Sequence, residues 1–228
     1  MLHAYLPSLL AGAQLTLAVA LASLVLALLL GLAGAAAKLS ASRFWRHAAT
    51  AYTTVIRGVP DLVLMLLIFF GGQIAVNALM QKLGFDYIDI DPFIAGVATL
   101  GFIFGAYFTE TFRGAMLAVP AGQIEAGRAF GMSGWTVFRR ITAPQMLRFA
   151  LPSFTNNWLV LVKSTALVSV IGLNDMMQKA GQAAGATHQP FTFYLAVGAL
   201  YLAITSVSVI ALRALEQRVS RGVRVAAL

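Results

Sequence analysis

The sequence lacks cysteine altogether and has few charged residues among its 228. Without cysteine the chain cannot form disulfides, zinc thiolates or a thiol nucleophile. Only 11% of the residues are charged, whereas 60% are hydrophobic, and a soluble domain of this size would need far more charge to stay in solution. The composition therefore indicates an all-α, polytopic membrane protein with little left over for a soluble domain.

Patterns typical of catalysis and metal binding are missing as well. No Gly-x-x-x-x-Gly-Lys-[Ser/Thr] loop occurs, so the chain does not bind ATP in that way. His3, His47 and His188 have no metal-ligand spacing, and no Ser-His-Asp or paired-carboxylate arrangement indicates hydrolysis. We therefore expect a chain that is not an enzyme and holds no metal or cofactor. Basic loops between membrane helices explain the net charge of +8 better than a nucleic-acid partner, so no nucleic acid is expected.

Five apolar runs are long enough to cross a bilayer. A spanning helix needs about 20 mostly apolar residues, because the hydrocarbon layer is roughly 30 Å thick and a helix rises about 1.5 Å per residue. The first run has no charged residue before Lys38, and the N-terminus lacks the basic region of a cleavable signal peptide, so we expect this run to be retained. The predicted spans are residues 9–36, 62–81, 93–109, 151–173 and 191–212.

Basic residues fall in alternate connections between these runs. The first loop, the third loop and the tail hold thirteen of the sixteen Lys and Arg residues. Since basic loops stay cytoplasmic, we expect the N-terminus on the periplasmic side and the C-terminus in the cytoplasm. Five spans satisfy this alternation, whereas adding or splitting a helix would break it. The basic residues of the tail are Arg213, Arg218, Arg221 and Arg224.

Local signals add detail between and within the spans. Asp91-Pro92 predicts a helix start, because Asp can cap a helix and Pro suits its first position. The polar stretch 174–188 predicts a short surface helix and a turn. Gly101-x-x-x-Gly105 indicates close helix packing within one subunit, in preference to a dimer seam.

The segment 120–152 is too polar to be a span and too long for a plain turn. We expect two short helices that meet at Gly131, which permits a sharp bend or a left-handed cap. Pro144 is expected to end or kink the second helix. Small residues at Ala126, Gly127 and Ala129 would allow another protein surface to approach closely. The spacing reads Glu125-Ala126-Gly127, three residues, Gly131, nine residues, Ile141-Thr142-Ala143-Pro144.

This spacing is similar to the EAA loop of bacterial ABC importer permeases, which reads Glu-Ala-Ala, three residues, Gly, nine residues, Ile-x-Leu-Pro. The chain departs from it at Gly127, which keeps the third position small, and at Ala143, which replaces Leu. Other motifs resemble the polar amino acid branch of these permeases, and within it the permeases of histidine/lysine/arginine/ornithine importers. They are Arg57-Gly58-Val59-Pro60-Asp61, Ile88-Asp89-Ile90-Asp91-Pro92, Tyr107-Phe108-Thr109-Glu110-Thr111, Glu110-Thr111-Phe112-Arg113-Gly114 and Lys163-Ser164-Thr165-Ala166-Leu167.

The resemblance implies a fold, a set of partners and a division of labour. The fold is that of type I (MetI-like) importer permeases, as a single transmembrane domain over residues 1–228. The partners are a second permease (identical or not), two ATPase subunits that carry ATP and Mg²⁺, and a periplasmic amino-acid-binding protein, all at the bacterial inner membrane. Residues 120–150 would couple to the ATPase. The coupling residues are Glu125, Ala126, Gly127, Arg128, Gly131, Met132 and Pro144.

Charged and polar residues inside the spans are the candidates for substrate binding, because such groups are costly in a membrane. Asp61 either attracts a cationic side chain or pairs with Arg57 or interfacial water. Glu110 is more readily explained by pairing with Arg113 at helical i, i+3 spacing than by substrate contact.

The fourth span is the most polar one. Asn156, Val160 and Lys163 fall on one face, with Asn157 and Ser164 beside it. Either these groups make interhelical hydrogen bonds, or they line the translocation path with Thr165 and bind the amino acid head group. Lys163 would hold the substrate carboxylate or neutralise a partner carboxylate. Because the chain has few acids at membrane depth, we expect the partner permease to supply another.

The resulting hypothesis is an importer permease for cationic amino acids that works by alternating access and is driven by a separate ATPase. One alternative is a permease of the same family for glutamine, glutamate or an opine, and Asp61 favours a cationic cargo over an anionic one. A self-sufficient secondary transporter is a second alternative, but the sequence shows no two related halves. A purely structural anchor would have no reason to carry the polar fourth span.

Overall fold

The computed structural model describes residues 2–219, which fold into helices with no strand among them. Five helical segments of this range are long and apolar enough to cross a membrane, which confirms the predicted number. Arg221 and Arg224 of the basic tail lie outside the described residues. The five segments are α1 (Leu2–Lys38), α3 (Asp61–Lys82), α4 (Pro92–Leu117), the stretch Gly134–Ile171 and α9 (Pro190–Val219).

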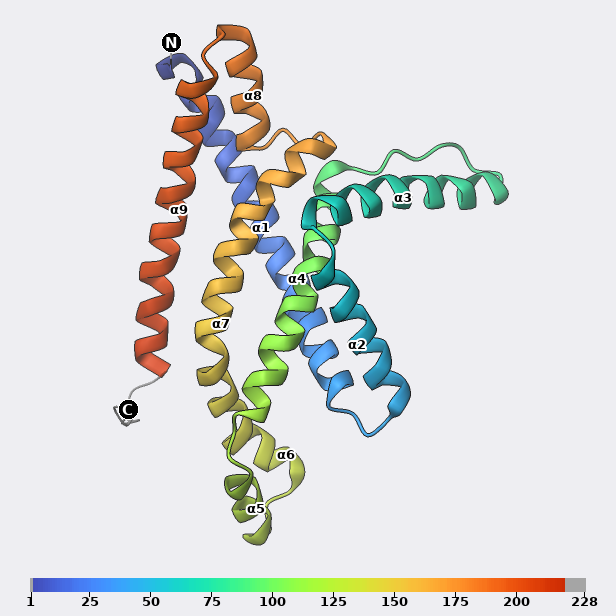
Figure 1. The fold of residues 1–228 in the computed structure, drawn as a ribbon, viewed down its shortest axis with the longest axis vertical. Coiled ribbons are helices and arrows are strands. Elements are labelled where there is room, and N and C mark those ends of the chain that lie inside the picture. Colours follow the sequence, from blue (N-terminus) through green and yellow to red (C-terminus); the bar gives the residue numbers. More distant parts are fainter. Residues whose placement is uncertain (1, 220–228) are drawn as a thin grey trace.

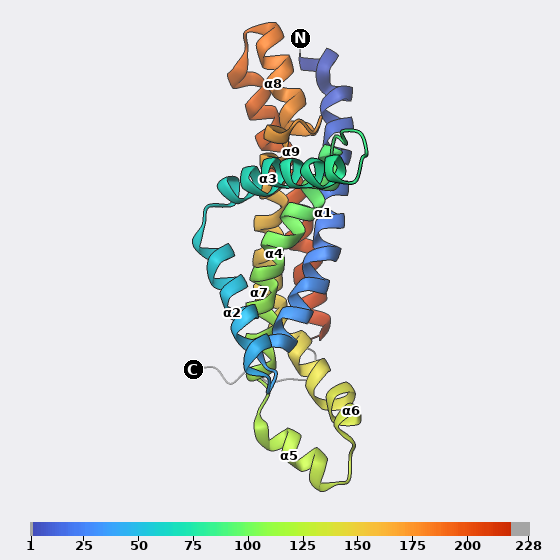
Figure 2. The same cartoon turned by 90° about the vertical axis from the view of Figure 1, so that its right-hand side faces the viewer.

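Most of the long helices run along the long axis of the molecule, and α3 leaves it. α1, α4, α7 (Ala143–Ser164) and α9 lie along that axis, while α3 projects sideways (Figures 1 and 2). The short helices α5 (Ala121–Ala129) and α6 (Gly134–Val137) form one end of the molecule, and α8 (Met176–Thr187) lies at the other end, beside the start of α1. α9 runs from the α8 end toward the α5–α6 end, as an odd number of spans requires.

The core is built on α1 and α4, which run in the same direction and pack closely through glycines (Figure 1). A Cβ on Gly101 would lie 2.5 Å from Cδ2 of Leu26, and one on Gly105 would lie 2.8 Å from Cβ of Leu30. These distances confirm that the Gly101-x-x-x-Gly105 spacing serves packing within the chain, since a side chain there would push the helices apart. The large side chains that are fully buried in this region include Val19, Leu100, Ile103, Phe104 and Phe108.

One helix was not predicted. Part of the basic stretch that follows the first span forms α2 (Arg43–Gly58). Its buried residues Ala49, Thr53 and Ile56 recur at helical intervals, so α2 packs one face on α1 and α4 and leaves the basic face exposed. α2 ends at Gly58 because Pro60 disfavours helix in the residue before it, and α3 begins directly after the proline.

The segment between α4 and α7 contains two short helices that meet at a glycine, as predicted. Gly131 separates α5 from α6 and has the left-handed φ of +77°. Of the two outcomes expected at Pro144, an end or a kink of the second helix, the end is wrong, because the chain stays helical into α7. A π-helical turn at Phe138–Thr142 precedes the proline, and the Ala143 N–H donates to the carbonyl five residues back. This wider turn accommodates Pro144, whose ring would clash with a carbonyl of a regular α-helix.

Two aspartates that lie outside the spans cap helices. Asp91 accepts from two backbone N–H groups in the first turn of α4, at 3.0 and 3.1 Å, as Asp91-Pro92 predicted. The predicted short helix after the fourth span is α8, and Asp175 caps it through the Gln178 N–H at 2.9 Å. Burial raises the pKa of the Asp175 carboxyl to about 6. The carboxyl is therefore neutral in the folded protein below that pH, and stability falls as the pH rises through it.

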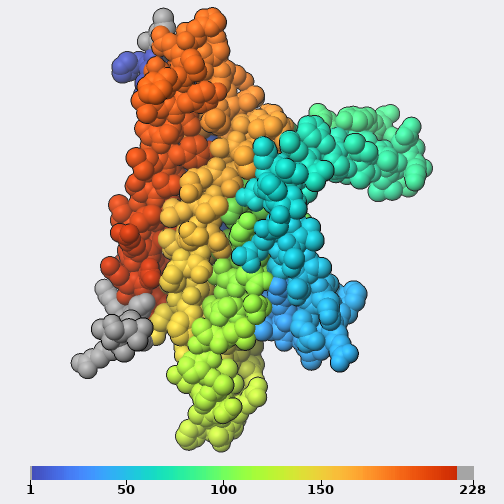
Figure 3. Space-filling view, viewed as in Figure 1, coloured from blue at the N-terminus to red at the C-terminus, as the bar shows by residue number. Residues whose placement is uncertain are grey.

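Amide side chains in the middle of α3 hold the segment that returns along this helix. Gln73 donates to the Tyr87 hydroxyl at 3.0 Å and accepts from the Ile90 N–H at 2.9 Å. Asn77 bonds both backbone groups of Ile88, at 2.7 and 2.8 Å. These bonds join α3 and the returning segment into the arm that projects from the body in Figure 3.

We expect Gly12→Ala to destabilise the chain. A Cβ on Gly12 would lie 2.7 Å from Cα and 2.8 Å from N of Met176, at the start of α8, and backbone atoms cannot turn aside as a side chain can. The loss should be about 1–3 kcal/mol, measured by thermal denaturation. Gly114→Ala is the matched control, since nothing lies within 4 Å of its Cβ position. Equal stability of the two variants would contradict this account of the α1–α8 contact.

Candidate functional site

A polar cleft of about 500 Å³ opens between α2, α4 and α7. Each of these helices contributes charged, hydroxyl or amide groups to it. Polar groups are costly in a membrane protein unless they serve pairing or a solute, so a cluster of them with open space between them indicates a site for a polar ligand. The lining residues are Arg57, Tyr107, Glu110, Thr111, Pro152, Ser153, Asn156 and Asn157.

The cleft lies beside the break between α2 and α3. Arg57, in the last turn of α2, places its guanidinium 5.4 Å from the ring centre of Tyr107 on α4. Asp61 begins α3, is partly buried, and interacts electrostatically with the same tyrosine. The alternative in which Asp61 pairs with Arg57 is wrong, because within residues 2–219 both ion pairs are made by Glu110. The break therefore presents one acid and one cation that lack an ion partner there.

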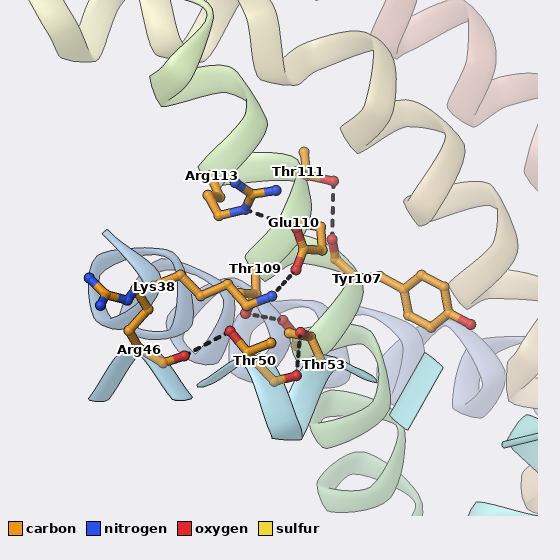
Figure 4. Close-up of polar contacts among 10 residues, drawn as sticks. Lys38, Arg46, Thr50, Thr53, Tyr107, Thr109, Glu110, Thr111 and Arg113 are labelled. Atoms are coloured by element: carbon orange, nitrogen blue, oxygen red, sulfur yellow. Dashed lines mark hydrogen bonds and ion pairs between the residues drawn. The ribbon is translucent and has the colours of Figure 1, made fainter. Parts of the chain in front are cut away.

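Glu110 is held by two cations from opposite sides (Figure 4). The predicted contact with Arg113 is confirmed, with Nε 3.0 Å from Oε2. The second contact, from Lys38 at the end of α1, was not predicted and joins α1 to α4. With both carboxylate oxygens engaged, Glu110 adds little negative charge to the cleft that it lines.

The two asparagines of α7 play different parts. Asn157 donates to the Thr111 hydroxyl at 2.9 Å, so it serves the interhelical bonding that was one of its two predicted roles. Asn156 is exposed at the cleft and makes no side-chain hydrogen bond within residues 2–219. Its amide offers both a donor and an acceptor to a bound molecule.

The Lys163-Ser164-Thr165 motif lies outside this cleft. Lys163 is exposed, on one face with Asn156 and Val160 as predicted, but it opens into a separate groove between α7 and α9. Thr165 is buried and donates to the Val162 carbonyl at 2.6 Å, so its hydroxyl is closed to a ligand in this conformation. Ser164 is partly buried at the end of α7.

Five cleft residues were missed as candidates: Arg57 itself, Tyr107, Thr111, Pro152 and Ser153. Arg57 was considered only as a partner for Asp61, and Tyr107 only as part of a motif. The sequence signal that could have identified Arg57 was Gly58-Val59-Pro60, which separates α2 from α3. Interrupted membrane helices often mark the binding sites of transporters, since their ends can face a ligand.

The predicted coupling segment forms the end of the molecule below α4 and α7 (Figures 1 and 2). Glu125, Ala126 and Arg128 are exposed on α5, whereas Gly127 is buried. A Cβ on Gly127 would lie 2.7 Å from Cδ1 of Ile141. Its small size therefore serves packing between α5 and the π-helical turn.

Two aromatic side chains at this end were not predicted as site residues. Phe130 is 87% exposed and Trp135 is 69% exposed, on either side of the Gly131 bend. Exposed large apolar groups on a projecting segment are typical of a protein-docking surface. We refer to Phe130 and Trp135 as the aromatic tip.

We expect Glu110→Gln to destabilise the chain by roughly 3 kcal/mol, because it leaves Lys38 and Arg113 without their shared acid. Thermal denaturation measures the loss. Adding Lys38→Met to Glu110→Gln should restore most of it, since the less exposed of the two cations is then gone. Glu125→Gln, at an exposed position, is the control. If Glu110→Gln and Glu125→Gln melt together, the cluster does not stabilise α1 against α4.

Comparison with known proteins places these features in a family. The family model "binding-protein-dependent transport system inner membrane component" matches residues 23–221. The histidine/lysine/arginine/ornithine transport system permease protein HisQ of Salmonella typhimurium is 54% identical over 98% of each chain. The octopine transport system permease protein OccQ of Rhizobium radiobacter is 43% identical, over 92% of this chain and 89% of that protein.

Solved structures agree with these relatives. An amino acid ABC transporter crystallised with histidines superposes with a TM-score of 0.82 at 32% identity, over 95% of this chain and 96% of that one. The inward-facing MetNI methionine ABC transporter shares the fold at 20% identity, with a TM-score of 0.75 over 97% and 100% of the two chains. The expected MetI-like, five-span permease fold is thus confirmed. The chain belongs to the family of inner membrane components of binding-protein-dependent transport systems.

Proposed function

We propose that this chain is one of two permease subunits of an ATP-driven importer of cationic amino acids in the bacterial inner membrane. The observation that supports this cargo is the polar cleft lined by Arg57, with Asp61 beside it at the start of α3. Asp61 is not a lining residue of the cleft, and neither Asp61 nor Arg57 has an ion partner within residues 2–219. Relatives at 54% and 53% identity are named as permeases for histidine, lysine, arginine and ornithine. This naming supports the same class of cargo here.

The charges of the cleft, together with Asp61 beside it, suit an amino acid with a cationic side chain. A lysine or arginine carries one carboxylate and two cationic groups, which need one cation and two acids around them. Arg57 and the Asn156 amide offer donors for the carboxylate, and Asp61 offers an acid for one cationic group. Glu110 is already neutralised by Lys38 and Arg113, so the second acid comes from the other permease.

An opine is the second candidate cargo. Relatives at 43% and 44% identity are named as octopine and nopaline permeases. The same cleft would bind such a compound, so direct uptake measurements with both classes of solute have to separate the two. Asp61 would repel an anionic substrate such as glutamate. We therefore favour cationic amino acids and opines over glutamate.

The energy for transport enters at the α5–α6 end. The chain lies with this end in the cytoplasm, since Arg128, Arg139 and Arg140 cluster there and basic segments stay cytoplasmic. Two ATPase subunits dock on the segment around Glu125 and on the aromatic tip. Their closure on ATP is passed through α5 and the π-helical turn to α7, which lines the cleft.

The opposite end receives the cargo. It carries α8 and the start of α1, and a periplasmic binding protein delivers the amino acid on that side. The two permeases then alternate between outward-open and inward-open arrangements around the cleft. ATP and Mg²⁺ stay on the ATPase subunits, so we assign no cofactor to this chain.

We expect Asp61→Leu to raise the apparent KM for lysine and arginine about tenfold, because a charge-assisted hydrogen bond contributes roughly 1.5–3 kcal/mol. Uptake is measured in vesicles that contain the complete importer. ATPase activity stimulated by the loaded binding protein should change less than uptake does. Uptake of any uncharged amino acid that the importer accepts should also change less.

Asp89→Leu is the matched control, since Asp89 lies on the exposed segment that returns along α3. It should leave lysine uptake as in the wild type. Unchanged lysine and arginine uptake in Asp61→Leu would contradict a specificity role for Asp61.

We expect Phe130→Ala, and Phe130→Ala with Trp135→Ala more strongly, to lower co-purification of the ATPase subunits with the permease. In the unmutated protein the rings of the aromatic tip would be buried against the ATPase subunits, and large apolar side chains contribute about 1.5–3 kcal/mol each when buried. Phe191→Ala is the control, because Phe191 is 78% exposed at the start of α9, at the other end of the molecule. ATPase recovery equal to that of the control would show that docking does not use the tip.

A further inference from the structure

A narrow apolar groove of about 310 Å³ runs between α1, α2 and α4. Its walls carry almost no polar surface, in contrast to the cleft on the other side of α2. The small residues Ala33 and Ala48 line it and are themselves exposed, so the groove is open to its surroundings. Its larger walls are Leu30, Trp45, Tyr52 and Phe102.

The groove extends from the edge of the membrane to its middle. Trp45 is in the first turn of α2, next to the end of α1 at Lys38, which is the cytoplasmic limit of the first span. At the other end, the Tyr52 hydroxyl donates to the carbonyl of Phe102. Phe102 lies ten residues beyond Pro92, about 15 Å along α4 and so halfway through a layer of roughly 30 Å. The lining residues extend over residues 30–37 of α1 and 45–52 of α2, which is about 10 Å of each helix. The groove therefore has the direction of a lipid acyl chain in the leaflet on the α5–α6 side and covers most of the depth of that leaflet.

The end of the groove at the membrane edge, near Trp45, is basic, and no acidic residue is close to it in the sequence. Arg43 and Arg46 are exposed and form no ion pair within residues 2–219. No Asp or Glu precedes Asp61 anywhere in the chain. Phe44 and Trp45 stand exposed beside these cations, with ring centres 5.4 Å apart. Aromatic rings next to arginines are typical of the headgroup layer of a membrane.

We propose that this groove binds an anionic phospholipid, with one acyl chain between α1 and α2 and the phosphate at Arg43 and Arg46. The apolar walls exclude a polar solute, and the run of unpaired cations selects a negative headgroup. The bound lipid would cover the side of α2 that faces the groove, beside its contact with the α1–α4 core. It would thereby steady the helix whose last turn brings Arg57 to the cleft.

The test uses the full-length chain with its co-purifying subunits in mild detergent, titrated with dioleoyl phosphatidylglycerol and with dioleoyl phosphatidylethanolamine. Native mass spectrometry counts the lipids that remain bound. We expect tighter binding of phosphatidylglycerol, and about a fivefold loss of that preference for each of Arg43→Gln and Arg46→Gln. Arg213→Gln, an exposed arginine on α9, is the charge control and should keep the preference.

A second pair of variants tests the groove itself. Ala48→Phe fills it and should abolish tight binding of the lipid, whereas Ala51→Phe adds the same ring to an exposed position of α2 outside the groove and should leave binding intact. Equal binding in these two variants would overturn the proposal. So would a photo-crosslink from position 48 that captures the second permease in place of a lipid, since the groove would then be a protein interface. Neither result depends on which amino acid is transported.

Discussion

The close packing of α1 on α4 is the constraint on which the rest of the structure depends. Glycines on both helices bring the backbones together: a Cβ on Gly31 would meet Cβ of Phe108 at 2.5 Å, and one on Gly34 would meet the Thr109 hydroxyl at 2.2 Å. Without a hydrophobic driving force inside a membrane, such contacts are what hold helices together. The α1–α4 contact also brings Lys38 to Glu110, and this ion pair neutralises the carboxylate that lines the cleft.

The break at Gly58-Val59-Pro60 turns this rigid pair into a site. α2 packs on the α1–α4 core through Ala49, Thr53 and Ile56, and its last turn delivers Arg57 to the cleft. The chain then changes direction, and Asp61 starts an arm that is largely free of the body. A cation and an acid thus sit where a fixed helix meets a projecting one. Movement of the arm relative to the core would change their separation, which is what a gated site needs.

Much of the fold could be predicted because its signals are local. The apolar runs predicted the five spans, Asp91-Pro92 predicted the start of α4, and Gly131 predicted the bend between α5 and α6. α2 was missed because charge and hydropathy treat a basic stretch as a loop, although its apolar positions repeat at helical intervals. Pro144 does not end its helix, which was one of the two expected outcomes, because a π-helical turn of the local backbone accommodates it.

The site was harder to predict than the fold. Glu110 with Arg113 could be predicted from i, i+3 spacing, whereas Lys38 is far away in the sequence and reaches Glu110 only through the α1–α4 packing. Helical periodicity placed Lys163 on one face with Asn156, but the cleft ends below it and α9 gives it a separate groove. Gly127 matched a docking motif, while its neighbours show that it packs against Ile141. Spacing defines a helix face, and only the tertiary fold shows what that face meets.

The central claim is that this chain forms a path for cargo and that the driving energy comes from other subunits. Lysine uptake into liposomes tests it most directly, with the complete importer compared against the purified permease alone under the same lysine gradient. We predict uptake against the gradient only when the ATPase subunits and ATP are present, and none by the permease alone. Concentrative uptake by the permease without an ATPase would contradict the account.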